Sequence, residues 1–385
     1  MKTLFFYSFL LHVIFFFTGR SNLNTTDKEE GARIDFGKLK TVNTADLISD
    51  YFYVALESSE ASLLGNIDQI EVYNDRIYIL DSSKTNALYV FTKEGKFAMK
   101  LEGKGDGPGE FISPHSFWID RGGYIFILDR QLDRLQKYRL SDLEFVEDVV
   151  LPSPAPTSFA LLPNSNHYIY YYSLRQHDAF SGKQFVIADG VGNVVSSFYD
   201  APPTAKILHG TPANFYLFNG QVRTYPHFSN KVYELADDSL KCCYTFSWEN
   251  QGFPPTELFQ KYKSSGEVMK EILTGTHDWI RLLYVYELPD MLAVKYYVKR
   301  DLYLSIADKD NNKFINIKNE QIVDDLGIGG KFPLPLTVCD DRFVGAINSF
   351  DIDRNKVKDK RLLDLLDNMS DEGNPILIFY SIDWV

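Results

Sequence analysis

The sequence predicts an all-β fold, a β-propeller whose blades are four-stranded antiparallel sheets. Two segments repeat one pattern, apolar residues that end in aspartate: Arg76–Asp81 and Tyr124–Asp129, with the aspartates 48 residues apart. A repeat of about 40 to 50 residues made of short strands is typical of propeller blades. Aromatic residues make up 15% of the chain, and such rings pack well on pleated sheets.

The chain begins with the pattern of a secretory signal. Met1 and Lys2 precede an apolar run over residues 4–17, which is too short for a comfortable membrane span and typical of a signal peptide. We therefore expect export to the periplasm or cell envelope. The expected organisation is a signal peptide over residues 1–19, a linker over 20–50 and one six-bladed propeller over 51–385.

The end of this signal resembles that of a bacterial lipoprotein, in which a small residue precedes a lipidated cysteine. Gly19 is the small residue, but Arg20 stands where the cysteine would be. Because no thiol is present there, a thioether lipid cannot form at that position. We expect membrane contact only through the N-terminal signal, and the sequence leaves its cleavage open.

The first two repeats each contain four short apolar segments separated by turns rich in Asn, Asp and Gly, the pattern of one blade. The expected strands of the first are 70–73, 77–80, 88–91 and 97–101, and those of the second are 115–119, 124–128, 135–140 and 145–151.

The later repeats keep the same rhythm with two helical interruptions. The expected strands are 159–162, 168–172, 184–188 and 194–199 in the third repeat, 215–218, 221–225, 231–235 and 242–246 in the fourth, 280–287, 291–298, 301–307 and 313–317 in the fifth, and 336–339, 343–348 and 375–380 in the sixth. Helices are expected within 256–273 and 358–369. A first strand at 51–56 should complete the last blade by pairing near 376–380, which closes the ring and removes its free edges.

These features resemble the six-bladed β-propeller family of exported bacterial proteins, which is related to NHL-repeat and TolB-like propellers. The resemblance covers the chain from about Tyr51 onward. It rests on the segments 64–67, 78–82, 103–111, 230–233 and 374–380, and on the NHL-like residues Asp129, Arg134, Leu135 and Tyr138. It implies a six-bladed ring, a place in the cell envelope near glycan-uptake systems, and no established catalytic motif.

The formal net charge is −12, which opposes nucleic-acid binding because a phosphate-binding surface needs clustered lysine and arginine. A neutral glycan or a positively charged ligand is easier to accommodate. The same acidity also keeps ordinary soluble proteins dispersed.

Residues 103–111 contain glycines at 103, 105, 107 and 109. Such a loop could cradle a phosphate, but it lacks P-loop spacing and a Lys-Ser/Thr pair. The favoured interpretation is a crossover between blades, with Phe111 packed into the next sheet.

Asp81 and Asp129 occupy equivalent places at the ends of strands. They could serve acid/base chemistry or bind calcium. Because aspartate readily accepts hydrogen bonds from turn N–H groups, a structural role is favoured.

No local pattern predicts a metal site or a nucleophile. The seven histidines, at 12, 115, 167, 177, 209, 227 and 277, show no H-E-x-x-H spacing, and no G-x-S-x-G occurs. We therefore predict no catalytic residue, no metal site and no cofactor. The three cysteines, at 242, 243 and 339, lack the spacing of a disulfide framework, so free thiols are favoured over a disulfide that joins Cys339 to one of the others.

Aromatic, basic and histidine side chains near the mouths of blades two and four are the candidate ligand-binding residues. They could stack on sugar rings or pair with carboxylates, and the alternative is that they pack between blades. The set is His115, Trp118, Arg130, His209, Arg223, Tyr225 and His227.

The leading hypothesis is a non-enzymatic, monomeric, exported propeller that binds a glycan, a peptide or a protein partner on one ring face, in glycan acquisition. The alternative is a metal-dependent propeller enzyme of the lyase or lactonase type, which would need histidine and carboxylate side chains from several blades around calcium or zinc. A structural subunit of an envelope complex is a third hypothesis.

Overall fold

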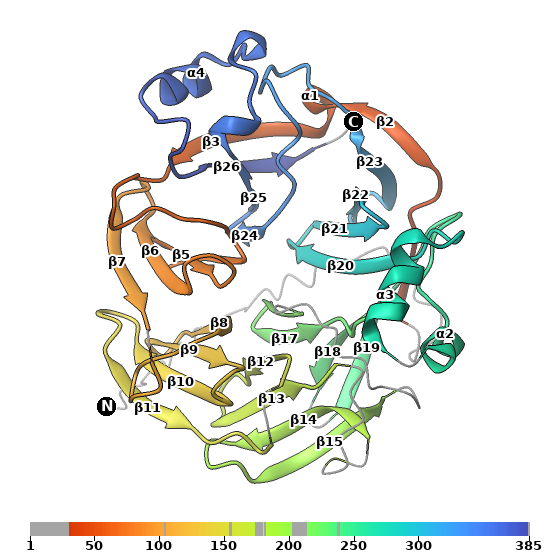
Figure 1. Ribbon diagram of the computed structural model, residues 1–385. Helices are drawn as coiled ribbons and strands as arrows, with labels where there is room; N and C mark the ends of the chain where they lie inside the picture. The colour runs from red at the N-terminus through yellow and green to blue at the C-terminus, as the bar shows by residue number, and fades with distance from the viewer. Residues whose placement is uncertain are drawn as a thin grey trace, which may run out of the picture.

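The computed structural model describes residues 31–103, 105–153, 156–173, 180, 182–201, 214–236, 239–262 and 264–383. These residues form six sheets arranged as blades around a central axis (Figure 1). The six-bladed β-propeller predicted from the sequence is therefore confirmed.

In each blade the strands follow one another from the axis outward. Blade one contains β4 (Gln69–Tyr73), β5 (Arg76–Asp81), β6 (Ala87–Thr92) and β7 (Phe97–Glu102); blade two contains β8 (Pro114–Asp120), β9 (Tyr124–Asp129), β10 (Arg134–Arg139) and β11 (Phe145–Val149); blade three contains β12 (Ser158–Leu161), β13 (His167–Tyr171), β14 (Lys183–Asp189) and β15 (Val194–Asp200).

Blades four and five have the same antiparallel core, and blade six takes its outermost strand from the N-terminal part of the chain. Blade four contains β16 (Phe215–Phe218), β17 (Gln221–Thr224), β18 (Lys231–Ala236) and β19 (Ser239–Ser247); blade five contains β20 (Ile280–Glu287), β21 (Met291–Val298), β22 (Asp301–Asp308) and β23 (Lys313–Val323); blade six contains β24 (Thr337–Cys339), β25 (Arg342–Ile347), β26 (Ile376–Ile382) and β3 (Ile48–Ala55).

The predicted closure of the ring is confirmed. Strand β3 pairs antiparallel with β26, with Tyr51 opposite Tyr380 and Tyr53 opposite Ile378. Blade six is thus built from both ends of the described chain, which leaves no open seam between the first and last repeats.

The prediction of a linker is wrong for residues 32–50. Strand β1 (Ala32–Asp35) pairs in parallel with β19 on the outside of blade four, and β2 (Leu39–Asn43) pairs in parallel with β23 on the outside of blade five. The short helix α1 (Thr44–Leu47) leads from there into β3. Ile34 is fully buried because alternate residues of β1 face the blade, a pattern too short to stand out in a charged segment.

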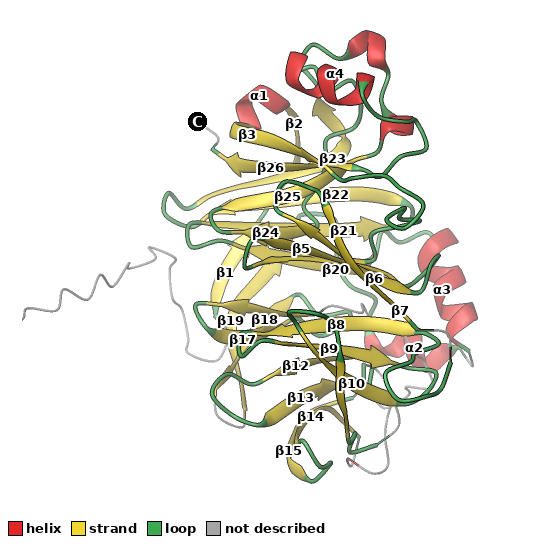
Figure 2. Cartoon of the chain, turned by 90° about the vertical axis from the view of Figure 1, so that its left-hand side faces the viewer, coloured by secondary structure: helices red, strands yellow, loops and turns green. Residues whose placement is uncertain are grey.

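The two expected helical regions are helical. The first contains α2 (Thr256–Lys261) and α3 (Ser265–Thr274), which begins with a capping box between Ser264 and Glu267. The second contains α4 (Lys360–Asp367), preceded by the short 3₁₀ turns Ser349–Asp351 and Arg354–Lys356. Figure 2 shows α2, α3 and α4 on the same side of the ring. No helix in the described part of the chain is long and apolar enough to cross a membrane.

The aspartates at the ends of β5 and β9 have the expected structural role. The fully buried Asp129 carboxylate accepts backbone N–H bonds from Ile112 and Ser113 in the incoming crossover and from Gln131 and Leu132 in the following turn, at 2.6–3.1 Å. Asp81 accepts four such bonds from residues 65, 66, 84 and 85. Each carboxylate ties the entry of its blade to the β-turn inside it.

The glycine-containing segment joins β7 of blade one to β8 of blade two, as predicted. Phe111 is fully buried in the core between these blades. A Cβ atom at Gly103 would lie 2.3 Å from the Phe111 backbone nitrogen, so the close approach of the chain requires glycine.

Candidate functional site

The inner strands β4, β8, β16, β20 and β24 line a central cavity of about 1600 Å³. From the axis the cavity extends outward between blades six and one. There, Phe52 and Phe379 stack with their ring centroids 4.8 Å apart. A cavity of this size is large enough for a ligand of several sugar rings.

Aromatic side chains from four blades form much of the cavity wall. They are Tyr73 from blade one, Trp118 from blade two, Tyr216 and Tyr225 from blade four, and Tyr284, Tyr286 and Tyr297 from blade five. Alternation along β20 explains part of this arrangement: Leu283 and Val285 pack into the core shared with blade four, whereas Tyr284 and Tyr286 lie on the opposite face of the strand.

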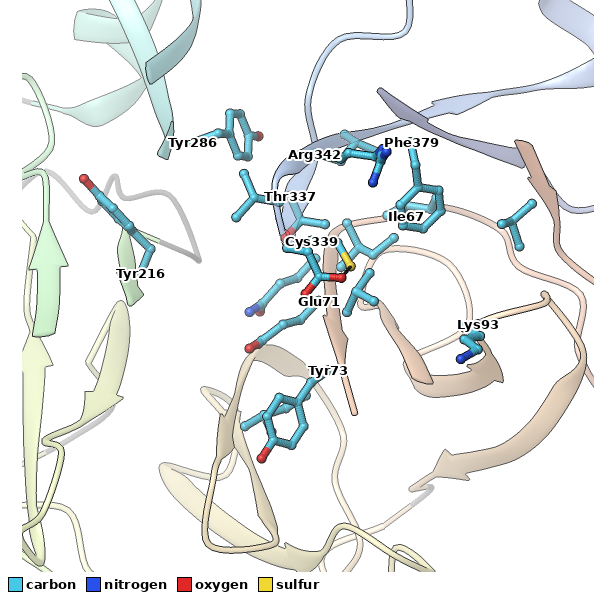
Figure 3. A pocket seen from close by; sticks show the side chains of 18 of the residues that line it. Ile67, Glu71, Tyr73, Lys93, Tyr216, Tyr286, Thr337, Cys339, Arg342 and Phe379 are labelled. Atoms are coloured by element: carbon cyan, nitrogen blue, oxygen red, sulfur yellow. Dashed lines mark hydrogen bonds between the residues drawn. The ribbon is translucent and has the colours of Figure 1, made fainter. Parts of the chain in front are cut away.

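Glu71 extends from the same face of β4 as Tyr73, and Figure 3 shows both beside the cavity, with Tyr216 and Tyr286 on other walls. Its half-buried carboxyl group has no hydrogen-bond partner among the described residues. Burial raises the pKa of Glu71 to about 7, although the positive charge of Arg121 acts in the opposite direction. The group can therefore accept or donate a hydrogen bond to a ligand near neutral pH.

A second carboxylate, Glu287 at the end of β20, is fully buried and fully paired. It accepts hydrogen bonds from Tyr216 and Tyr244 at 2.8 and 2.7 Å, and it pairs with Arg223 at 2.7 Å and Lys309 at 3.2 Å. Arg223 also pairs with Glu234 at 3.0 Å. This network joins blades four and five, and its charges are compensated within the protein.

The residues predicted from the sequence do not form one cluster. Trp118 and Tyr225 line the central cavity. Arg223 is engaged by Glu287 and Glu234. His227 packs against Phe228 with the two rings tilted and their centroids 4.1 Å apart, and it lines a separate small pocket beside Arg281.

His115 and Arg130 lie near each other in blade two. Burial, with the charge of Arg130 as a smaller cause, lowers the pKa of His115 to about 4, so its imidazole is neutral at neutral pH. The His115 Nε2 atom has no hydrogen-bond partner within the described residues. His209 lies outside the described residues.

Within the described ranges, no group of three or more His, Cys, Asp and Glu side chains is arranged to hold a metal ion. The three cysteines are free thiols, in accord with the favoured prediction. Burial raises the pKa of Cys339, which lines the cavity, to about 11, so this thiol is protonated and weakly reactive.

Sequence reasoning missed Glu71, Tyr284, Tyr286 and Lys295. A signal for Lys295 was present, because it is the single charged residue in the otherwise apolar and aromatic segment Met291–Val298. Glu71 carried no such signal, since alternating polar residues also occur on strands that face solvent.

The closed ring of six sheets, four of them four-stranded and two extended to five strands by β1 and β2, and the central cavity define a six-bladed β-propeller. The chain belongs to the protein family described as 6-bladed beta-propeller, which matches residues 20–346. No curated protein sequence matches the chain.

Among solved structures, a protein of Bacteroides fragilis NCTC 9343 that is named as a supposed exported protein is similar over 91% of this chain and 100% of that chain, with a TM-score of 0.81 and 23% identity. This similarity supports the fold. The WD40 repeats of RRP9 give a TM-score of 0.45 at 11% identity over 90% of this chain and 100% of that chain. The structure of U3-55K gives a TM-score of 0.46 at 11% identity, over 88% of this chain and 99% of that chain.

Proposed function

We propose that the protein is an exported, non-enzymatic propeller that binds a saccharide in its central cavity, as a step in glycan acquisition. The observation that carries this proposal is the large cavity walled by aromatic side chains from several blades. Aromatic rings offer apolar faces for sugar rings, while tyrosine hydroxyl groups and Glu71 offer hydrogen bonds.

The proposed location is the periplasm or cell envelope, with the protein acting as a monomer. It is supported by the signal-peptide pattern of residues 1–19 and by the name of the Bacteroides fragilis neighbour. Fractionation of cells that produce the full chain tests the location, and recovery in the cytoplasmic fraction would contradict it.

Titration calorimetry of the purified protein against neutral oligosaccharides and peptides tests the binding function. We expect saturable binding of at least one oligosaccharide. The variant Tyr73→Ala should weaken it roughly tenfold, because it removes an aromatic surface from the cavity wall. Phe350→Ala is the control, since Phe350 is 73% exposed and lies outside the cavity lining.

Equal loss of affinity in both variants would contradict a site in the cavity. Absence of binding to every saccharide, or turnover of a glycan or lactone, would overturn the proposed function and favour the enzyme hypothesis.

A further inference from the structure

Lys295 is a buried cation on the cavity wall. It belongs to β21 and is only 7% exposed. Its Nζ atom donates a hydrogen bond of 2.7 Å to the carbonyl oxygen of Pro335, at the entry to blade six. The same atom lies 5.0 and 5.2 Å from the ring centroids of Tyr284 and Tyr286.

Lys295 differs from the neighbouring buried cations. Arg223 and Lys309 share the carboxylate of Glu287, whereas no carboxylate in the described part of the chain forms an ion pair with Lys295. An ammonium group taken out of water without a partner is costly. The two tyrosine faces and one carbonyl compensate part of this cost, and burial lowers the pKa of Lys295 to about 7.

The amine also retains hydrogen-bonding capacity. An ammonium group has three N–H donors, and the structure assigns one of them to Pro335. Three titratable side chains surround the amine: Tyr284, Tyr286 and Tyr297, the last from the same strand as Lys295. Burial raises the pKa of Tyr284 and of Tyr286 above the ordinary value for tyrosine, so both remain neutral. Glu71 belongs to a different wall, on blade one.

We propose that Lys295 binds the carboxylate of an acidic saccharide, a uronate, in the central cavity. This inference rests on the saccharide-binding function proposed above and names the chemical class of the ligand. A single carboxylate supplies the missing counter-charge and accepts the remaining N–H groups, while Tyr284 and Tyr286 present ring faces to the adjoining sugar.

The test compares a panel of oligouronates with the fully methyl-esterified forms of the same oligomers, by titration calorimetry on the full chain. Each pair differs only in the charge of its carboxyl groups. We expect at least one oligouronate to bind about tenfold or more tightly than its ester. Lys295→Met should abolish that difference, whereas Lys241→Met, which removes an exposed cation that lies outside the cavity lining, should preserve it.

Thermal unfolding of both variants shows whether each of them is folded. Lys295→Met should unfold at the same or a higher temperature than the parent, since a buried charge that is only partly compensated is removed. If it does not fold, Lys295→Gln serves in its place. Binding of neutral oligosaccharides without any preference for an acid over its ester would overturn this inference and leave the proposed function intact. Absence of binding to the oligouronates, to their esters and to every neutral oligosaccharide would overturn both this inference and the proposed function.

Discussion

At the residue scale, the cavity is notable for two ionisable groups whose surroundings favour the uncharged form. Burial raises the pKa of Glu71 and lowers that of Lys295, in both cases to about 7. Neither side chain forms an ion pair with another described residue, in contrast to Glu287. Groups that are desolvated beside a cavity and form no ion pair are candidates for contact with a ligand.

Glu71 should make the stability of the protein depend on pH. Its folded-state pKa of about 7 lies above the ordinary value of 4.5. The contribution of Glu71 to the unfolding free energy is therefore fully present below about pH 4.5 and is lost as the pH rises through 7. Glu71→Gln removes this dependence. Relative to the parent, the variant should gain about 1–3 kcal/mol in unfolding free energy between pH 4.5 and pH 8.

Urea unfolding of parent and variant at several pH values measures this gain. Asp75→Asn is the matched control, because Asp75 is exposed and pairs with Lys93 at the surface. A difference between parent and Glu71→Gln that stays constant with pH would show that Glu71 titrates normally in the folded protein.

At the scale of elements, the N-terminal strands bind three successive blades on their outer edges. Strand β1 adds to blade four, β2 adds to blade five and β3 completes blade six. Strand β1 pairs in parallel with β19, and β2 pairs in parallel with β23. Each pairing adds a fifth strand to a blade that otherwise has four. These strands therefore connect blades that are separate in the repeat pattern.

A pair of substitutions tests whether the first of these strands contributes to the fold. Ile34 is fully buried against blade four with Phe246 and Trp248, whereas Leu39 in β2 is 42% exposed. Ile34→Ala should lower the unfolding free energy by about 2–4 kcal/mol, because it leaves a cavity in the core. Leu39→Ala should change it little. Equal, small effects in urea unfolding would mean that residues 32–35 behave as the linker expected from the sequence.

At the scale of the whole molecule, the ring could be predicted because each blade is specified by short-range patterns in the sequence. Each blade is a run of short strands and turns, and Asn74 and Asp75, both with positive φ, form the tight turn between β4 and β5 that their residue types indicate. The pairing of β3 with β26 followed from the need to close a ring of sheets.

The cavity could not be predicted in the same way, because its residues come together only once the ring is closed. Glu287 binds Arg223 and Tyr216, which lie 64 and 71 residues away in the sequence. Arg223, which the sequence predicted to bind a ligand, therefore belongs to an internal network. Trp118 and Tyr225, which were predicted from their residue type, line this cavity. Lys295 and Glu71 required knowledge of burial and of charged neighbours, which no local pattern contains.

Closure by the N-terminal strands predicts that the ring unfolds as a whole when they are removed. A chain that begins at Glu57 lacks β3, so the backbone of β26 becomes a free edge and Phe379 loses its stacking partner Phe52. We expect this chain to aggregate and to lose cooperative urea unfolding, because an open, apolar sheet edge recruits other chains. A chain that begins at Gly31 keeps β1 to β3 and should remain soluble, monomeric in size-exclusion chromatography and cooperative in unfolding. If the shorter chain matched it in all three properties, blades one to five would be stable without closure, and the N-terminal strands would be an accessory to the ring.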